Sequence, residues 1–353
     1  MKATINDVAK RAGVSMKTVS RVLNKEPNVA VKTRERVTAI ARELNYTPNF
    51  AARGLASSKS YLLALMYDDI NPIYVMEIQN GAIDVCREHG YHLVLEPVKT
   101  PIVSWSNPKA HEDLTAELET RLKGLAVDGV ILTPPLCDSQ TVLGILKRLN
   151  IASVRVGPSQ NLTHANNYKY PPAIFMDDKQ AAFDVTEALI ATGHKDLGFI
   201  EGHKNHGSSY LRLEGFKAAT EKHNLIVPKS RIVQGDYTFQ SGIAAANALL
   251  SESGARPTAI FASNDDMAAG VVSVANRLGV NVPSDLSVCG FDDAPIARKM
   301  SPQLSSVCQP IYEMGNRAVK LLLARKDDSL PRLQIVDYKL VFRGSTARCL
   351  DKE

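Results

Sequence analysis

The 353-residue chain has few cysteines and no long apolar run. Its five cysteines are scattered and odd in number, and they show neither a disulfide framework nor the spacing of metal ligands. No apolar stretch approaches the roughly 18 residues of a membrane-spanning helix, and the N-terminus lacks the apolar centre of a signal peptide. We therefore expect neither export nor membrane spanning, and we predict a protein of the reducing cytoplasm.

Motifs of catalysis are also missing. The sequence contains no nucleophile elbow, no phosphate-binding P-loop and no cluster of metal ligands. Two carboxylate doublets, Asp265-Asp266 and Asp292-Asp293, have the composition of a glycosidase acid pair. Adjacent residues on one strand or loop point apart, so we interpret these doublets as helix caps or braces. The sequence predicts neither an enzyme nor a cofactor.

Positive charge is concentrated at the start of the chain. Residues 1–60 hold 12 Lys and Arg against 4 Asp and Glu, a formal charge of +8, whereas the remainder holds 30 against 33, a charge of −3. A basic segment attracts phosphate groups whatever their sequence. A solvated charged surface is the alternative.

A length of 353 residues further suggests two or three compact units.

Three short helices are expected in this basic head. Thr4 and Asp7 have the spacing of a capping box, Gly13 permits the left-handed turn that ends a helix, and Ser15 can cap the next helix. The helices are predicted near residues 5–12, 16–23 and 32–44, with Val8, Ala9, Ala12, Val19, Val22, Leu23, Val37, Ile40, Ala41 and Leu44 facing inward.

Residues 7–24 read D-V-A-x-x-A-G-V-S-x-x-T-V-S-R-V-L-N, and K-T-R-E-R-V and E-L-N-Y-x-P-N follow. This pattern resembles the DNA-binding head of the lactose-repressor family of bacterial transcription regulators. One departure is Ala30, which stands where Ser or Thr usually caps the third helix and costs about 1 kcal/mol of local stability.

The resemblance implies a helix-turn-helix whose second helix enters the major groove of DNA. Lys17 and Arg21 can donate to guanine, and Met16 can contact a thymine methyl group. Hydroxyl and amide side chains nearby would mainly hold phosphates. The expected DNA contacts are Thr4, Ser15, Met16, Lys17, Thr18, Ser20, Arg21, Asn24, Thr33, Asn49, Arg53 and Leu55.

A hinge helix is expected at residues 49–56, where the family pattern continues as A-x-x-L-A. A helix of this length is unstable alone in water, so it would order only when two copies pack on DNA. The resemblance implies that Leu55 wedges into the central base step from the minor groove, with Asn49 and Arg53 along the same groove. A plain linker with a chance leucine is the alternative.

From Tyr61 onward, short apolar runs alternate with helical patterns, which predicts parallel, doubly wound sheets. The predicted strands are 62–67, 92–97, 129–133, 152–156, 197–200, 259–262 and 286–290. The predicted helices are 73–89, 111–125, 139–149, 179–192, 208–223, 239–250 and 265–278.

The body carries the landmarks G-H-x-x-x-G-F-I, R-L-E-G-F, A-I-F-A-S-N-D-D-M-A-A-G and V-C-G-F-D-D. They are similar to those of the lactose-repressor body, which has a two-lobed fold like that of periplasmic sugar-binding proteins. For Arg212 and Asp292 a structural ion pair is the alternative to ligand contact, and Tyr74 and Tyr237 could instead be core aromatics. By the resemblance, the effector-binding residues are Tyr74, Ser208, Arg212, Tyr237, Asn264, Asp292 and Gln309.

Two positions in the sequence narrow the chemical class of the effector. Purine-binding relatives carry Arg and Phe where this chain has His206 and Val75, which argues against a purine and for a mono- or oligosaccharide or a derivative. Segments 100–113 and 158–173 depart from the usual family lengths, and the second could cover the site. Arg155 could reach the ligand or form a salt bridge.

The α/β chain is thus predicted to have a three-helix head and hinge helix, followed by a two-lobed body. We place the head at 1–48, the hinge and linker at 49–60, the body at 61–343 and a C-terminal tail at 344–353. Within the body, the N-lobe is placed at about 61–157 plus 293–323 and the C-lobe at about 173–291 plus 324–343. The predicted protein is a sugar-responsive repressor that binds a near-palindromic operator as a homodimer.

Overall fold

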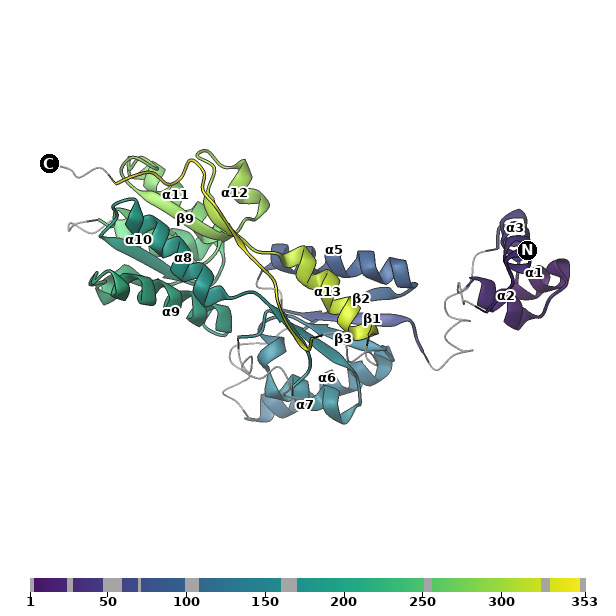
Figure 1. The fold of residues 1–353 in the computed structure, drawn as a ribbon. Helices are drawn as coiled ribbons and strands as arrows, with labels where there is room; N and C mark the ends of the chain where they lie inside the picture. Colours follow the sequence, from purple (N-terminus) through teal and green to yellow (C-terminus); the bar gives the residue numbers. More distant parts are fainter. Residues whose placement is uncertain are drawn as a thin grey trace. The chain divides into compact units, whose positions relative to one another are not determined.

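The computed structural model describes residues 3–23, 28–46, 59–68, 71–98, 108–159, 170–250, 256–324 and 331–349, with side chains omitted for 108–114. It divides into two compact units, Met1–Tyr61 and Leu62–Glu353 (Figure 1). Within the described ranges, no helix is both long and apolar enough to cross a membrane.

The first unit is the predicted three-helix head. Thr4 and Asp7 form the complete capping box of α1 (Ile5–Ala12), and Gly13 ends that helix with φ 61°. Ser15 Oγ accepts a hydrogen bond from the Thr18 backbone at the start of α2 (Met16–Leu23). Ala30 precedes α3 (Val31–Glu43) without a side-chain cap, which confirms the expected departure from the family pattern.

One apolar centre holds these three helices together. Val8, Val19 and Val37, one from each helix, are completely buried. Smaller alanines fill the space between them and allow the helices to approach closely. The inward face predicted from the 3.6-residue period is confirmed at every position, although Leu23, Ile40 and Leu44 are only partly buried.

The second unit contains two six-stranded sheets. The first has the order β11-β5-β4-β3-β1-β2 and is entirely parallel. The second has the order β12-β10-β9-β8-β6-β7 and is parallel except for the β10–β12 pair. The strands of the first sheet are β1 (Leu62–Tyr67), β2 (His92–Pro97), β3 (Gly129–Leu132), β4 (Ser153–Val156), β5 (Ala173–Phe175) and β11 (Leu333–Ile335). Those of the second are β6 (Leu197–Glu201), β7 (Ile232–Gln234), β8 (Ala259–Ala262), β9 (Ser287–Asp292), β10 (Ser305–Cys308) and β12 (Lys339–Val341).

Helices cover both faces of each sheet, which gives two lobes (Figure 1). In the N-lobe, α5 and α13 pack side by side on one face and α6 and α7 lie on the other. In the C-lobe, α8 and α9 form one layer and α10 and α11 the opposite one. The bounds are α5 (Pro72–His89), α6 (Pro108–Leu125), α7 (Gln140–Arg148), α8 (Asp178–Ala191), α9 (Gly207–Lys222), α10 (Phe239–Leu250), α11 (Asp265–Arg277), α12 (Pro295–Lys299) and α13 (Ile311–Leu323).

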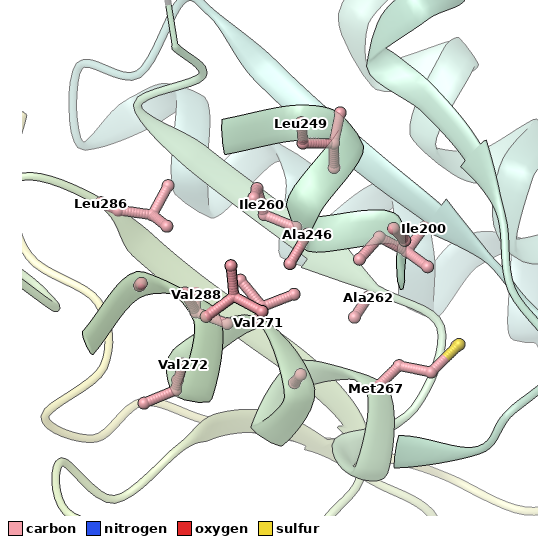
Figure 2. Close-up of a cluster of buried hydrophobic side chains, with 14 of the residues drawn as sticks. Ile200, Ala246, Leu249, Ile260, Ala262, Met267, Val271, Val272, Leu286 and Val288 are labelled. Atoms are coloured by element: carbon pink, nitrogen blue, oxygen red, sulfur yellow. The ribbon is translucent and has the colours of Figure 1, made fainter. Parts of the chain in front are cut away.

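Figure 2 shows the aliphatic layer between α10, α11 and the second sheet. Ile260 and Val288 from the strands meet Leu249 and Val271 from the helices, and all four are at most 1% exposed. This face contains small and branched side chains, and Gly242 and Gly270 lie where α10 and α11 come too close for a side chain. The tight layer fixes the start of α11 next to the end of β9.

The predicted lobe boundaries were wrong at three short strands. β5 and β11 belong to the N-lobe sheet rather than to the C-lobe, and β10 belongs to the C-lobe sheet rather than to the N-lobe. The chain therefore crosses between lobes at 176–177, 309–310 and 336–338. β5 and β11, like the equally unpredicted β7 and β12, have only three residues, and β10 begins with two serines, so no apolar run of sufficient length identified them.

Residues 344–349 are not a free tail, which corrects a second prediction. The Ser345 backbone oxygen accepts a hydrogen bond from Val288, and the Ser345 hydroxyl bridges Val288 and Ser305. The Cys349 backbone donates to Thr192. The segment suggested a tail because the backbone groups and single hydroxyls that hold it form no apolar or periodic pattern.

The close contact between α8 and α9 predicts a stability effect. A Cβ at Gly215 would overlap the Lys179 backbone oxygen and lie 2.8 Å from the Phe183 nitrogen. Gly215→Ala should therefore lower the free energy of unfolding by about 1–3 kcal/mol in urea. Gly144→Ala is the control, because its Cβ would meet only Arg148 at 3.8 Å and should add about 0.5–1 kcal/mol. Equal effects of the two substitutions would contradict this packing.

Candidate functional site

The N-terminal end of α2 presents a polar surface with one apolar residue at its tip. Met16 is 52% exposed, and Lys17 and Arg21 are also exposed. Val19 and Val22 on the opposite side are buried in the head core, so the fold itself directs these three side chains outward. This is the arrangement that a groove-reading helix requires.

Thr4 caps α1, and its hydroxyl donates to Asp7 Oδ2 at 2.7 Å. Its DNA contact stays a prediction. Ser15, Thr18, Ser20 and Thr33 lie in the described part of the head, and their DNA contacts stay predictions. Asn24, Asn49, Arg53 and Leu55 lie outside the described residues, as does most of segment 158–173.

A cavity of about 40 Å³ lies between the two lobes of the second unit. The crossover residues Met176 and Gln309 line it, so the cavity lies where the chain passes between the sheets. The N-lobe contributes Asp68, Asn71, Tyr74, Val75, Thr133, Pro134, Gly157 and Met314, and the C-lobe contributes Asp178, His206, Ser208, Arg212, Tyr237 and Asp292.

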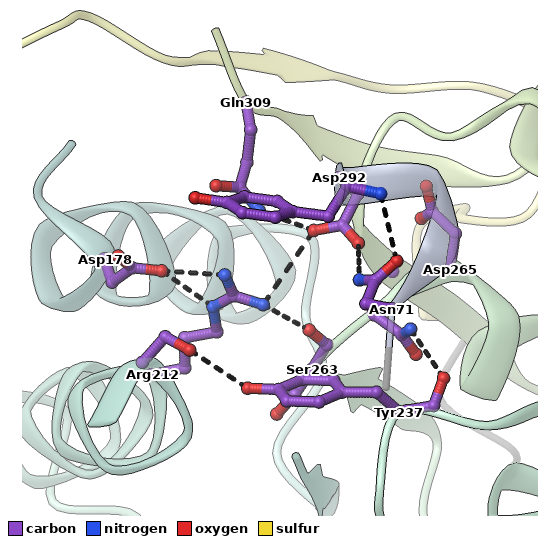
Figure 3. Close-up of polar contacts among 12 residues, drawn as sticks. Asn71, Asp178, Arg212, Tyr237, Ser263, Asp265, Asp292 and Gln309 are labelled. Carbon is purple, nitrogen blue, oxygen red and sulfur yellow. Dashed lines mark hydrogen bonds and ion pairs between the residues drawn. The ribbon is translucent and has the colours of Figure 1, made fainter. Parts of the chain in front are cut away.

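Arg212 is held between two carboxylates on one side of this cavity (Figure 3). Its Nε and Nη2 each lie 2.8 Å from Asp178 Oδ1, and its Nη1 donates to the Ser263 backbone oxygen at 2.5 Å. Asp292 Oδ1 lies 3.9 Å from Nη1. The guanidinium plane also rests on Phe291, with 3.6 Å to the ring centroid. The cation is therefore fixed in position and electrically compensated.

Asp292 connects the lobes by hydrogen bonds (Figure 3). Asn71 in the N-lobe caps α5 with its amide oxygen and donates its amide nitrogen to Asp292 Oδ2 at 3.3 Å. Gln309, at a crossover, donates to Asp292 Oδ1 at 2.5 Å. The Asp292 carboxylate at the end of β9 thus accepts hydrogen bonds from the N-lobe and from a segment that crosses between the lobes.

Two lining residues have strained backbones. Tyr237 has φ 72° and Asp292 has φ 109°, in the region that favours glycine. Such conformations cost about 1–3 kcal/mol each and tend to occur at functional sites. The strain at Tyr237 lets its hydroxyl reach Ser208 Oγ at 3.1 Å, while the Tyr237 backbone oxygen accepts from Asn264.

Burial shifts the acid–base properties of the cavity groups. Desolvation raises the pKa of Asp292 to about 6, against the opposing effects of Arg212 and the amide donors. Desolvation likewise raises the pKa of Asp178 despite its ion pair. The pKa of His206 falls to about 3, chiefly through burial and further through His203 and Arg212. Within the described residues, no group of three His, Cys, Asp or Glu is placed to hold a metal ion.

Comparison with known proteins assigns this arrangement to a family. Residues 4–49 match the family "Bacterial regulatory proteins, lacI family", and residues 186–346 match the "Periplasmic binding protein-like domain". Catabolite control protein A of Priestia megaterium is 36% identical over 98% of this chain and 100% of the relative. The chain belongs to the lacI family of bacterial regulatory proteins. It is a transcriptional regulator and not an enzyme, as predicted.

Other lacI-family proteins match along the whole chain. The HTH-type transcriptional repressor PurR of Klebsiella pneumoniae (strain 342) is 32% identical over 98% of this chain and 97% of the relative. The lac repressor dimer bound to operator and the anti-inducer ONPF has a TM-score of 0.78 at 27% identity, covering 98% of this chain and 100% of that one. The transcriptional regulator CelR–cellobiose complex has a TM-score of 0.68 at 27% identity, covering 97% and 99%. The predicted fold class is thereby confirmed.

Six of the seven predicted effector residues line the cavity: Tyr74, Ser208, Arg212, Tyr237, Asp292 and Gln309. Asn264 does not, which corrects that prediction. Its amide oxygen caps α11 by accepting from Met267, and its amide nitrogen donates to the Tyr237 backbone at 2.8 Å. Both ends of the amide are used within the lobe, so Asn264 supports Tyr237 instead.

Asp265 and Asp293 brace the site, as interpreted from the sequence. Asp265 accepts from the Ser306 hydroxyl and the Ala294 backbone, both at 2.7 Å, and Asp293 pairs with Arg343 at 2.7 Å. Arg155 takes its alternative role as an ion pair, since it is 1% exposed and lies 3.7 Å from Asp138 Oδ1.

Sequence reasoning missed Asn71 and Asp178. Asn71 directly precedes Pro72, and an Asn-Pro pair before a helical pattern signals an N-cap that could have been recognised. Asp178 is the first residue of α8 and follows the capping Asp177, so it resembles an ordinary charge of a first turn. Only the tertiary contact with Arg212 distinguishes it.

The raised pKa of Asp292 predicts a pH-dependent stability difference. Because its folded pKa exceeds the ordinary 3.8, the contribution of Asp292 to stability is most favourable at low pH and is lost as pH rises from about 4 through 6. Asp292→Asn should therefore gain stability relative to the parent protein over this range, by up to about 3 kcal/mol. Urea unfolding at pH 4 and pH 7 measures this difference. The exposed Asp337→Asn serves as control, and a parallel pH trend in the two variants would contradict the assignment.

Proposed function

We propose that this regulator is a cytoplasmic repressor that binds a near-palindromic operator as a homodimer and responds to a sugar or sugar derivative in the interlobe cavity. The proposed parts are a DNA-binding head at 1–48, a hinge at 49–60 and an effector-binding and dimerisation body beyond it. The observation that carries the proposal is a lacI-type head with an outward-facing α2 on the same chain as a polar cavity.

Three observations support operator binding. Residues 1–60, which comprise the head and the hinge, carry a formal charge of +8, which favours phosphate contact and makes binding depend on salt. The exposed Met16, Lys17 and Arg21 supply one apolar and two donor side chains for base edges. The solved lac repressor dimer is bound to operator, and a two-fold dimer places two recognition helices on a palindrome. Leu55 is proposed to mark the operator centre.

Three observations support a sugar or sugar derivative as the effector. Arg212 and Asp292 stand ready to hydrogen-bond hydroxyl groups, and Tyr74 and Tyr237 supply aromatic faces with polar tips. The neighbouring structure of CelR contains cellobiose. Although relatives named PurR match this chain, His206 and Val75 replace the Arg and Phe expected of a purine site.

The interlobe hydrogen bonds suggest how ligand binding is linked to operator binding. Asn71 of the N-lobe and Gln309 of a crossover both donate to Asp292 of the C-lobe. A ligand that competes for these donors changes how the lobes meet. Operator affinity then changes only as far as the ligand prefers one lobe arrangement to the other.

The proposed operator binding is tested with the variant Arg21→Ala. Loss of a donor pair to a base should weaken binding to the natural operator by about 5- to 150-fold, measured by fluorescence anisotropy at fixed salt. Arg148→Ala on the body surface is the matched control and should bind normally. Unchanged affinity of Arg21→Ala would overturn the role assigned to α2.

Adding sugars to the same assay tests whether a sugar controls operator binding. A sugar that raises the melting temperature of the full-length protein should also change its operator affinity. The proposal fails if stabilising sugars leave operator binding unaltered at saturation, or if labelled glycosides are turned over.

A further inference from the structure

His206 is a buried side chain in the cavity with an unused hydrogen-bonding group. It precedes α9, is 7% exposed and lines the cavity. Its Nε2 is buried and has no hydrogen-bond partner among the described residues. A buried polar group without a partner costs about 1–3 kcal/mol, so Nε2 favours a ligand that can form a hydrogen bond with it.

The ring of His206 is held in one place. It meets the rings of His203 and Tyr237 edge to face, each with 5.5 Å between centroids. Burial and the nearby Arg212 lower its pKa to about 3, so the imidazole is neutral around pH 7. A neutral imidazole nitrogen is a donor or an acceptor according to tautomer, and a hydroxyl group can serve as partner in both cases.

Charge in the cavity disfavours an anionic ligand. The described lining residues include three carboxyl groups, Asp68, Asp178 and Asp292, against the single guanidinium of Arg212. That guanidinium already contacts Asp178 through two nitrogens at 2.8 Å. A sugar phosphate would bring a charge of about −1.5 to −2 at pH 7 into this acidic surrounding.

Helix N-termini at the cavity have the opposite sign, because a helix N-terminus attracts anions. Three helices begin at lining residues: α5 at Asn71, α8 at Asp178 and α9 beside Ser208. Each N-terminus is equivalent to roughly half a positive charge, and Asn71 and Asp177 already cap α5 and α8. Even three half charges are smaller than the excess of two carboxyl groups over Arg212, so the balance still disfavours phosphate.

We infer that the effector is an uncharged, unphosphorylated carbohydrate and that His206 Nε2 binds one of its hydroxyl groups. This inference rests on the proposed sugar control of the regulator. It assigns His206 as a specificity-determining residue, while Arg212 and Asp292 bind other hydroxyl groups.

The test uses the full-length protein and matched pairs of ligands. Cellobiose, glucose and ribose are compared with glucose 6-phosphate and ribose 5-phosphate by thermal shift and then by calorimetry. At least one unphosphorylated sugar should bind, and the phosphate esters should bind at least tenfold more weakly.

His206→Phe should weaken binding of the selected sugar at least tenfold, and His206→Gln, which keeps polar atoms, should restore part of the loss. His203→Gln is the control, because His203 touches His206 but does not line the cavity.

Operator binding by each variant reports that it is folded. Equal or tighter binding of a phosphate ester would overturn the inference while leaving sugar control intact. Unchanged sugar affinity in a folded His206→Phe would overturn the role of His206. If no compound of either kind binds the parent protein or alters its operator affinity, the proposed sugar control itself fails.

Discussion

The buried ion pair between Arg212 and Asp178 is the interaction on which the cavity depends. Both side chains are almost completely buried, and three nitrogens of the guanidinium are fixed by Asp178 and the Ser263 carbonyl. Burying two charges costs several kcal/mol each, so such a pair is a weak source of net stability. Its effect is geometric: it holds a cation beside Asp292, against the Phe291 ring, before any ligand arrives.

The fold determines where this pair lies. In parallel sheets the carboxyl ends of the strands meet at one edge, and Asp292 ends β9 at such an edge. Two of the three crossovers place Met176 and Gln309 at the same edge, so the chain passes the cavity at both of these points. Asn71, the cap of α5, then reaches Asp292 from the other lobe. Strain at Tyr237 and Asp292 indicates that this geometry is imposed by the surrounding structure.

Much of this architecture could be predicted from the sequence, because long elements carry strong signals. The head followed from the Thr4–Asp7 capping box and the buried valines, and the longer strands and helices followed from their apolar periods. The resemblance to a known family supplied the cavity residues that periodicity could not. Arg212 illustrates the limit: its sequence context did not reveal that Asp178, 34 positions away, compensates its charge.

The errors have three different physical origins. β5, β10 and β11 have three or four residues, and their sheet membership depends on partners distant in sequence. Asn264 was assigned to the ligand by the family resemblance, yet its side chain caps α11. Residues 344–349 are held to the C-lobe by backbone groups and by single hydroxyl groups such as that of Ser345, which form no periodic pattern.

Arg212 and Asp178 are paired for ligand binding rather than for stability. The most direct measurement is urea unfolding of Arg212→Met, Asp178→Leu and the double variant, together with sugar binding. Each single variant should lose about 3–5 kcal/mol, because it leaves a buried charge without its closest partner, whereas the double variant should return to within about 1 kcal/mol of the parent and fail to bind sugar. A double variant as unstable as the single variants, or one that binds sugar normally, would contradict the claim.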